Sequence, residues 1–163
     1  MRILGIDPGY AIVGYGIIES EKGKLIPLDY GAVETPSKLS TVERLKMIEA
    51  QITELVTEIK PDEIAVEELF FNTNITTGIK VAQARGVVLL SCSKMCDKLF
   101  EYTPLQIKST VTGNGTASKQ QVQFMVISLL QLKETPKPDD AADALAAAIC
   151  HGLSASGIKR GLK

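Results

Sequence analysis

Two hydrophobic periodicities alternate along this chain. The N-terminal part favours strands: residues 2–7 are a short apolar run, and residues 12–19 and 25–34 alternate and are rich in β-branched and aromatic side chains. A turn at residues 21–24 joins the last two of these segments. Three consecutive strands with short connections predict an antiparallel meander.

The apolar period then changes to that of a helix. Over residues 40–60 apolar side chains recur at steps of three and four, Ser40 and Glu43 form a capping-box sequence, and Pro61 ends the segment. Further along, two strands and four helices are expected at residues 63–69, 76–95, 99–103, 104–111, 118–132 and 139–152. This order predicts an α/β domain over residues 1–153, with a mixed sheet and helical crossovers, followed by a short basic, flexible tail at 154–163.

Composition limits the class of protein. The chain has 163 residues, of which 45% are hydrophobic and 23% charged, a balance that fits one globular domain and excludes a disordered chain, a collagen and a coiled coil. No apolar run reaches the roughly 18 residues of a membrane span, and the sequence MRILGID lacks the pattern of a signal peptide. Three cysteines do not make a disulfide framework, so we expect a cytoplasmic protein.

The net charge of −1 argues, taken alone, against a nucleic-acid partner. The charges are unevenly distributed, however. Residues 1–68 hold 7 basic and 13 acidic residues (net −6), residues 69–133 hold 7 and 2 (net +5), and residues 134–163 hold 4 of each. The average therefore masks a basic middle segment, so the net charge does not exclude a nucleic-acid partner and suggests a binding face on one side of the molecule.

Four carboxylates indicate where chemistry takes place. Asp7 ends the first strand and Glu67 lies near the end of the fourth, while Asp140 and Asp143 share one face of an alanine-rich helix. Each acid also has a purely structural explanation. Asp7 would belong to a turn after the strand, Glu67 would be a charge at a sheet edge, and Asp139 and Asp140 would be first-turn acids favoured by the helix dipole. Carboxylates that converge at neighbouring strand ends repel unless cations bind between them, and oxygen ligands suit Mg²⁺ or Mn²⁺. The pattern thus favours metal-dependent phosphoryl chemistry.

Two assignments depend on local geometry. Glu68 follows Glu67, but successive side chains of a strand point to opposite faces, so we expect only Glu67 to join Asp7. Asp139 precedes Asp140, and only Asp140 stands three residues from Asp143.

A series of motifs resembles the RuvC family of bacterial Holliday junction resolvases along essentially the whole chain. In order they are GIDPG at 5–9, GYG at 14–16, AVE at 65–67 with Phe70, QARGV at 83–87, Lys108, GNG at 113–115, Lys119 and DAADALA at 140–146. The resemblance implies an RNase H-like fold, with a five-stranded mixed sheet flanked by helices.

The resemblance also implies an endodeoxyribonuclease of recombination and repair. The catalytic and metal-binding residues would be Asp7, Glu67, Asp140 and Asp143, holding two Mg²⁺ ions, with Mn²⁺ as a substitute. They would nick one phosphodiester in each of two opposed strands of four-way junction DNA and leave 5′-phosphate and 3′-hydroxyl ends. The alternatives are another metal-dependent nuclease of this fold, such as an RNase H or a YqgF-like protein, an actin-like or sugar-kinase-like ATPase, and a junction-binding protein without catalysis.

DNA contacts and partners follow from the same resemblance. Phe70 would stack on a base, and Lys108, Lys119 and Arg85 would contact DNA. The alternatives are that Phe70 is an aromatic anchor of the core, that the two lysines are simply solvated, and that Arg85 is structural. The apolar helix at 76–95 would form a homodimer interface, and the branch-migration proteins RuvA and RuvB would be partners. His151, the only histidine, is expected to be a helix C-terminal cation or hydrogen-bond donor rather than part of the site.

Overall fold

Five strands form one mixed sheet in the order β3-β2-β1-β4-β5. The computed structural model describes residues 1–68 and 75–161, with side chains described up to residue 154 except at 75 and 76. The strands are β1 (Arg2–Asp7), β2 (Ile12–Glu21), β3 (Lys24–Glu34), β4 (Glu63–Glu67) and β5 (Leu99–Tyr102). The first three are antiparallel, whereas β4 lies parallel to β1 and to β5, as the mixed sheet predicted from sequence requires.

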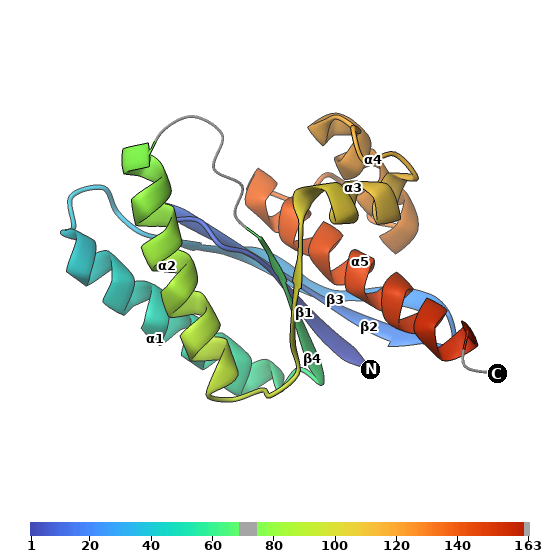
Figure 1. Cartoon of the computed structure of the whole chain (residues 1–163), viewed down its shortest axis with the longest axis horizontal. Helices are drawn as coiled ribbons and strands as arrows, with labels where there is room; N and C mark the ends of the chain where they lie inside the picture. The colour runs from blue at the N-terminus through green and yellow to red at the C-terminus, as the bar shows by residue number, and fades with distance from the viewer. Residues whose placement is uncertain (69–74, 162–163) are drawn as a thin grey trace.

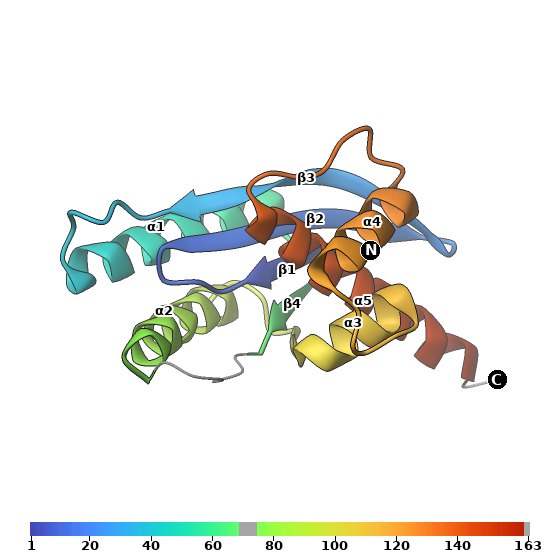
Figure 2. The same cartoon turned by 90° about the horizontal axis from the view of Figure 1, so that it is seen from above.

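Helices cover both faces of this sheet (Figures 1 and 2). On one face lie α1 (Thr41–Ile59) and α2 (Ile75–Ser93); on the other lie α3 (Pro104–Thr112), α4 (Lys119–Leu130) and α5 (Asp139–Gly161). Within the described residues, no helix combines the length and the apolar character needed to cross a membrane.

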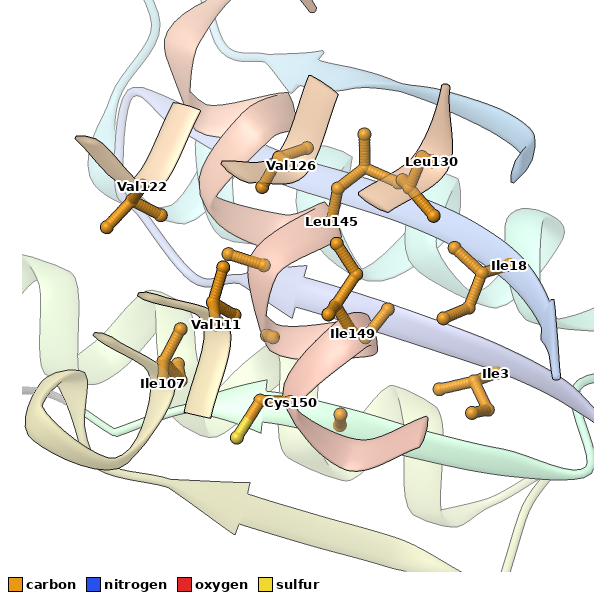
Figure 3. Close-up of a cluster of buried hydrophobic side chains, with 14 of the residues drawn as sticks. Ile3, Ile18, Ile107, Val111, Val122, Val126, Leu130, Leu145, Ile149 and Cys150 are labelled. Carbon is orange, nitrogen blue, oxygen red and sulfur yellow. The ribbon is translucent and has the colours of Figure 1, made fainter. Parts of the chain in front are cut away.

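The alternation of β1 divides its side chains between two cores. Leu4 and Ile6 belong to the core on the α1 and α2 side, while Ile3 belongs to the core that includes residues of α3, α4 and α5. Figure 3 shows the second core, in which Leu145 and Ile149 of α5 lie between the sheet and the buried side chains of α3 and α4. Odd-numbered positions of β1 therefore face α5, and Asp7 is one of them.

The helix and strand assignments made from sequence are confirmed, with differences at their ends. Ser40 and Ser118 form the expected capping boxes at the starts of α1 and α4, and Thr103 forms a third at the start of α3 that was not predicted. The predicted end of the last helix at Gly152 is wrong, because α5 continues to Gly161. No proline follows Gly152, and glycine inside a helix costs only about 1 kcal/mol, so the sequence contains no strong stop signal there.

Candidate active site

Asp7 and Glu67 meet at one edge of the sheet because their strands are parallel neighbours. The register pairs Ile6 with Val66, so the next residues, Asp7 and Glu67, both lie at the carboxyl edge of the sheet. Ala65 packs into the α5-side core whereas Val66 packs on the other side, so alternation directs Glu67 to the face that Asp7 occupies. Two carboxylates thus lie at adjacent strand ends, on the side covered by α5.

Close packing of α5 on the sheet brings Asp140 and Asp143 to the same place. A Cβ atom at Gly5 would lie 2.1 Å from the carbonyl oxygen of Ala144, and one at Gly14 would lie 2.0 Å from that of Asp140. Only glycine allows the helix backbone to approach the strands this closely. The glycines of β1 and β2 and the alanines of α5 therefore position the start of α5 against the carboxyl end of β1.

Three of these acids line a cleft of about 380 Å³, and Asp140 does not line it. Its lining includes Asp7, Glu67 and Asp143, together with Lys108 from α3 and Lys119 from the first turn of α4. The cleft thus brings together carboxylates and lysines from five separate elements, an arrangement that suits metal-assisted phosphodiester chemistry.

Burial and mutual repulsion perturb these carboxyl groups strongly. Desolvation, with smaller contributions from Glu67, Asp143 and Asp140, raises the pKa of Asp7 from 3.8 to about 8. Desolvation and the charge of Asp143 raise the pKa of Glu67 from 4.5 to about 7, although Lys108 and Lys119 act in the opposite direction. The pKa of Asp143 is also raised, mainly by burial. The site therefore carries more negative charge than its two lysines compensate.

Lys119 is the principal internal counter-ion. Its Nζ lies 3.0 Å from a carboxylate oxygen of Asp143 and 3.5 Å from one of Asp139. Burial lowers the pKa of Lys119, but the hydrogen bond to Asp143 and the nearby acids outweigh this effect and raise the pKa overall. Asp139 is thus a partner of Lys119, while the charge of Asp140 reaches Asp7.

The donor set fits a divalent cation, although the acids are not gathered into a ready cage. In the described ranges, 1–68 and 75–161, no three His, Cys, Asp or Glu side chains are grouped closely enough to hold a metal ion. The carboxyl groups nevertheless lie close enough to raise one another's pKa values, which is the repulsion that a bound cation would relieve. Oxygen donors without nitrogen or sulfur suit Mg²⁺ or Mn²⁺.

Comparison with known proteins gives one consistent answer. The family profile described as crossover junction endodeoxyribonuclease RuvC matches residues 3–151. The chain belongs to the RuvC family. The RuvC protein of Halothermothrix orenii is 56% identical over 154 residues, which are 94% of this chain and 93% of that protein.

Solved RuvC structures agree with this fold. Thermus thermophilus RuvC superimposes with a TM-score of 0.87 at 36% identity over 96% of each chain. The structure of T. thermophilus RuvC in complex with Holliday junction substrate gives the same TM-score at 35% identity, over 95% of this chain and 94% of that one. The RNase H-like arrangement expected from the RuvC resemblance is therefore confirmed.

The other residues that the RuvC resemblance singled out lie away from the cleft or outside the described residues. Arg85 lies on α2 and forms an ion pair with Glu101 of β5, and it does not line the cleft. Phe70 lies outside the described residues. The structure thus brings Lys108 and Lys119 to the four acids but does not bring Arg85 there.

Two features of the site were not foreseen. Glu68 lines the cleft as well, since β4 ends at Glu67 and strand alternation does not extend to the next residue. Of the two glutamates, only Glu67 contributes to the raised pKa of Asp7, and the expectation that only Glu67 joins Asp7 stays a prediction. The pairing of Lys119 with Asp139 and Asp143 had no sequence signal beyond its place at a helix start.

His151 belongs to a different, buried cluster. It is 2% exposed, its Nε2 lies 2.6 Å from Glu63, and its Nδ1 lies 2.7 Å from the hydroxyl of Tyr102. Glu63 begins β4, at the opposite end of the strand from Glu67, and none of the three residues of this cluster lines the carboxylate cleft. His151 therefore links α5 to β4 and β5 by hydrogen bonds, away from the carboxylate cleft.

Proposed function

We propose that this chain is a structure-selective endodeoxyribonuclease that resolves Holliday (four-way) junctions in homologous recombination and DNA repair. The observation that carries the proposal is the convergence of Asp7, Glu67 and Asp143 on one cleft, with Asp140 close enough for its charge to raise the pKa of Asp7, within a chain that matches the RuvC family almost from end to end. The proposed products are paired nicks in opposed strands, with 5′-phosphate and 3′-hydroxyl ends.

The four carboxylates would hold two Mg²⁺ ions, or Mn²⁺ as a substitute. When bound, these ions would supply Lewis-acid activation of water and would neutralise charge on the attacked phosphate. Asp7 is central among the four, because its pKa responds to the charges of the other three acids. Asp7 would therefore take part in holding the ions, together with the other three acids.

The chain's own residues position the DNA strand. Lys108 and Lys119 line the cleft from α3 and α4, where their ammonium groups can contact the phosphates that flank the scissile bond. Water attacks phosphorus, and the bond to the 3′ oxygen breaks, so that the phosphate stays on the 5′ end. Base stacking by Phe70 stays a prediction, as does a DNA contact by Arg85, whose pairing with Glu101 favours a structural role.

A homodimer would match a substrate with two equivalent strands to cut. Ile79 and Leu90 of α2 are 55% and 57% exposed, and they stand eleven residues apart, about three helical turns, on one face. This uncovered apolar face supports a symmetric interface formed by α2. RuvA and RuvB as partners, and the cytoplasm as the location, also belong to the proposal; the free, buried thiols Cys92, Cys96 and Cys150 fit a reducing compartment.

The test compares three labelled substrates in Mg²⁺: a synthetic four-way junction, a linear duplex of the same sequence and an RNA–DNA hybrid. We expect preferential, paired nicking of the junction, which EDTA abolishes. Asp7→Asn should retain junction binding and lose cutting, while Asp97→Asn, which changes an exposed acid outside the cleft, should cut normally. Preferential cutting of the hybrid would instead identify an RNase H, and full activity of Asp7→Asn would remove Asp7 from the mechanism.

A further inference from the structure

A second hollow lies beside the carboxylate cleft, on the α3 and α4 side of the molecule. Its volume is about 380 Å³, and its lining includes Phe124, Met125 and Ala117 together with the amide side chains of Asn114, Gln120 and Gln121. We call this hollow the α4 groove. It is walled by an aromatic ring and amides and its lining contains no acidic residue.

The aromatic ring of the α4 groove is not part of the hydrophobic core. α4 is held to the domain by Val122, Val126 and Leu130, which are buried at intervals of four residues. Phe124 is two positions from both Val122 and Val126, about 200° around the helix, and its side chain is 69% exposed. Folding therefore gives no reason for an aromatic residue at this position.

The amides around this ring have unused hydrogen-bonding groups. Gln120 makes no side-chain hydrogen bond within the part of the chain that the structure describes. The Oε1 atom of Gln121 accepts from Ser118, and the Oδ1 atom of Asn114 accepts from Thr116. The NH₂ groups of these two amides have no hydrogen-bond partner among the described residues, and both residues line the groove. Such groups can pair with the edge of a heterocyclic ring lying on Phe124.

The surrounding charge favours a polyanion. Residues 103–132, which include α3 and α4, contain Lys108 and Lys119 and no acidic residue. Lys119 lines the catalytic cleft, and the next two residues, Gln120 and Gln121, line the α4 groove. From Lys119 to Phe124 the helix rises about 7.5 Å, which corresponds to about two nucleotide steps along a strand.

We propose that the α4 groove binds an unpaired nucleobase of the DNA substrate, stacked on Phe124 and held at its edge by the amides of Gln120, Gln121 and Asn114. The inference rests on the proposed function, since a strand that reaches the catalytic cleft passes the start of α4. It adds a second base-binding position that lies on the basic layer of the fold, close to the scissile phosphate.

The experiment measures junction affinity by fluorescence anisotropy, with Ca²⁺ in place of Mg²⁺ so that binding is followed without turnover. Phe124→Ala should weaken binding by about five- to hundred-fold, the range measured for loss of one base-stacking ring. Phe124→Leu, which keeps an apolar side chain without a ring, should be equally defective, and Phe124→Trp should bind as the unchanged protein does. Val42→Ala alters a 61% exposed residue of α1 on the opposite layer and should have no effect.

A second readout locates the base. Junctions carrying 2-aminopurine at successive unpaired positions should show fluorescence quenching at one position, and Phe124→Ala should abolish it. Thermal melting should be the same for all the variants, because the ring is exposed.

Three results would overturn the inference. Junction affinity unchanged in Phe124→Ala would assign the α4 groove to another occupant, such as a protein partner. Dissociation of a dimer by Phe124→Ala would make the groove an interface between copies, and full rescue by Phe124→Leu would exclude stacking. If the protein without substitutions cuts four-way junctions normally in each of these cases, only the assignment of the α4 groove fails. If that protein neither binds nor cuts four-way junctions, the proposed function fails as well.

Discussion

Replacing Asp7 by asparagine should stabilise the metal-free protein at alkaline pH while it abolishes cutting. Burial raises the pKa of Asp7 to about 8, so the folded state holds this proton over a pH range in which the unfolded chain has lost it. Between about pH 4 and pH 8 the folded state thus binds more protons than the unfolded state, and stability falls as pH rises. Asparagine has the shape of the protonated acid and does not titrate.

The size of the effect follows from the pKa shift. A rise from 3.8 to about 8 is about 4 units, equivalent to about 6 kcal/mol at pH values above 8 and to about 2 kcal/mol at pH 5. Part of the shift comes from Glu67 and Asp143, which take up protons themselves as the charge on the cleft grows. We therefore expect Asp7→Asn to raise the free energy of unfolding by about 2–5 kcal/mol at pH 8 and by less than half as much at pH 5.

Urea unfolding in EDTA at several pH values measures this difference directly. Asp97→Asn is the matched control, since it changes an exposed acid outside the cleft and should follow the parent curve. Added Mg²⁺ should stabilise the parent protein and leave Asp7→Asn much less affected. Parallel pH profiles for the parent and Asp7→Asn would refute the claim that Asp7 is a buried, uncompensated carboxyl group.

Three further predictions concern packing, hydrogen bonding and charge. Gly5→Ala should lower the free energy of unfolding in urea by about 3 kcal/mol or more, because the new Cβ meets the α5 backbone. The control is Gly86→Ala on α2, where nothing lies within 4 Å of the new Cβ, and it should stabilise the protein by about 0.5–1 kcal/mol. Equal effects of the two substitutions would contradict the close approach of α5. His151→Ala should cost about 1–3 kcal/mol because Glu63 loses its hydrogen bond to the imidazole and keeps only the ion pair with Lys98, and His151→Gln should recover part of this in the same assay. Lys119→Ala should reduce the slope of log junction affinity against log salt by about one, and an unchanged slope would place the phosphate elsewhere.

Much of the fold was predictable because its signals are local. The capping boxes at Ser40 and Ser118 are read from residues three apart, and strand or helix periodicity from a few neighbours. The end of α5 was not predictable in the same way. Gly152 resembles a helix stop, but its surroundings include Ile3 and Ile18 of the sheet, against which the helix packs and continues.

The candidate site was predictable in its acids and not in its counter-ions. Asp7 and Glu67 could be placed together because parallel strand ends share an edge, which follows from topology alone. The ion pair between Lys119 and Asp143 joins the starts of two helices whose relative position depends on tertiary packing. The cluster of His151 with Glu63 joins residues 88 apart in sequence, and neither residue type in its local context indicates the other.

The distribution of charge in space resolves the conflict between a net charge of −1 and a DNA substrate. Four acids of the N-terminal segment, Glu43, Glu49, Glu54 and Glu58, belong to α1, which covers the face of the sheet opposite α3 and α4 (Figure 1). The acid-free α3 and α4 layer is therefore free to contact phosphates.

The acids of the cleft itself would still repel DNA. Two divalent ions bound there would change the net charge of the protein from −1 to +3. Because linkage is reciprocal, a metal that strengthens DNA binding must itself bind more tightly when DNA is present. The raised pKa values of Asp7 and Glu67 mean that these groups keep part of their protons near neutral pH, which limits the negative charge of the cleft. Both carboxyl groups become fully ionised only when a cation binds, and DNA bound beside them favours that cation.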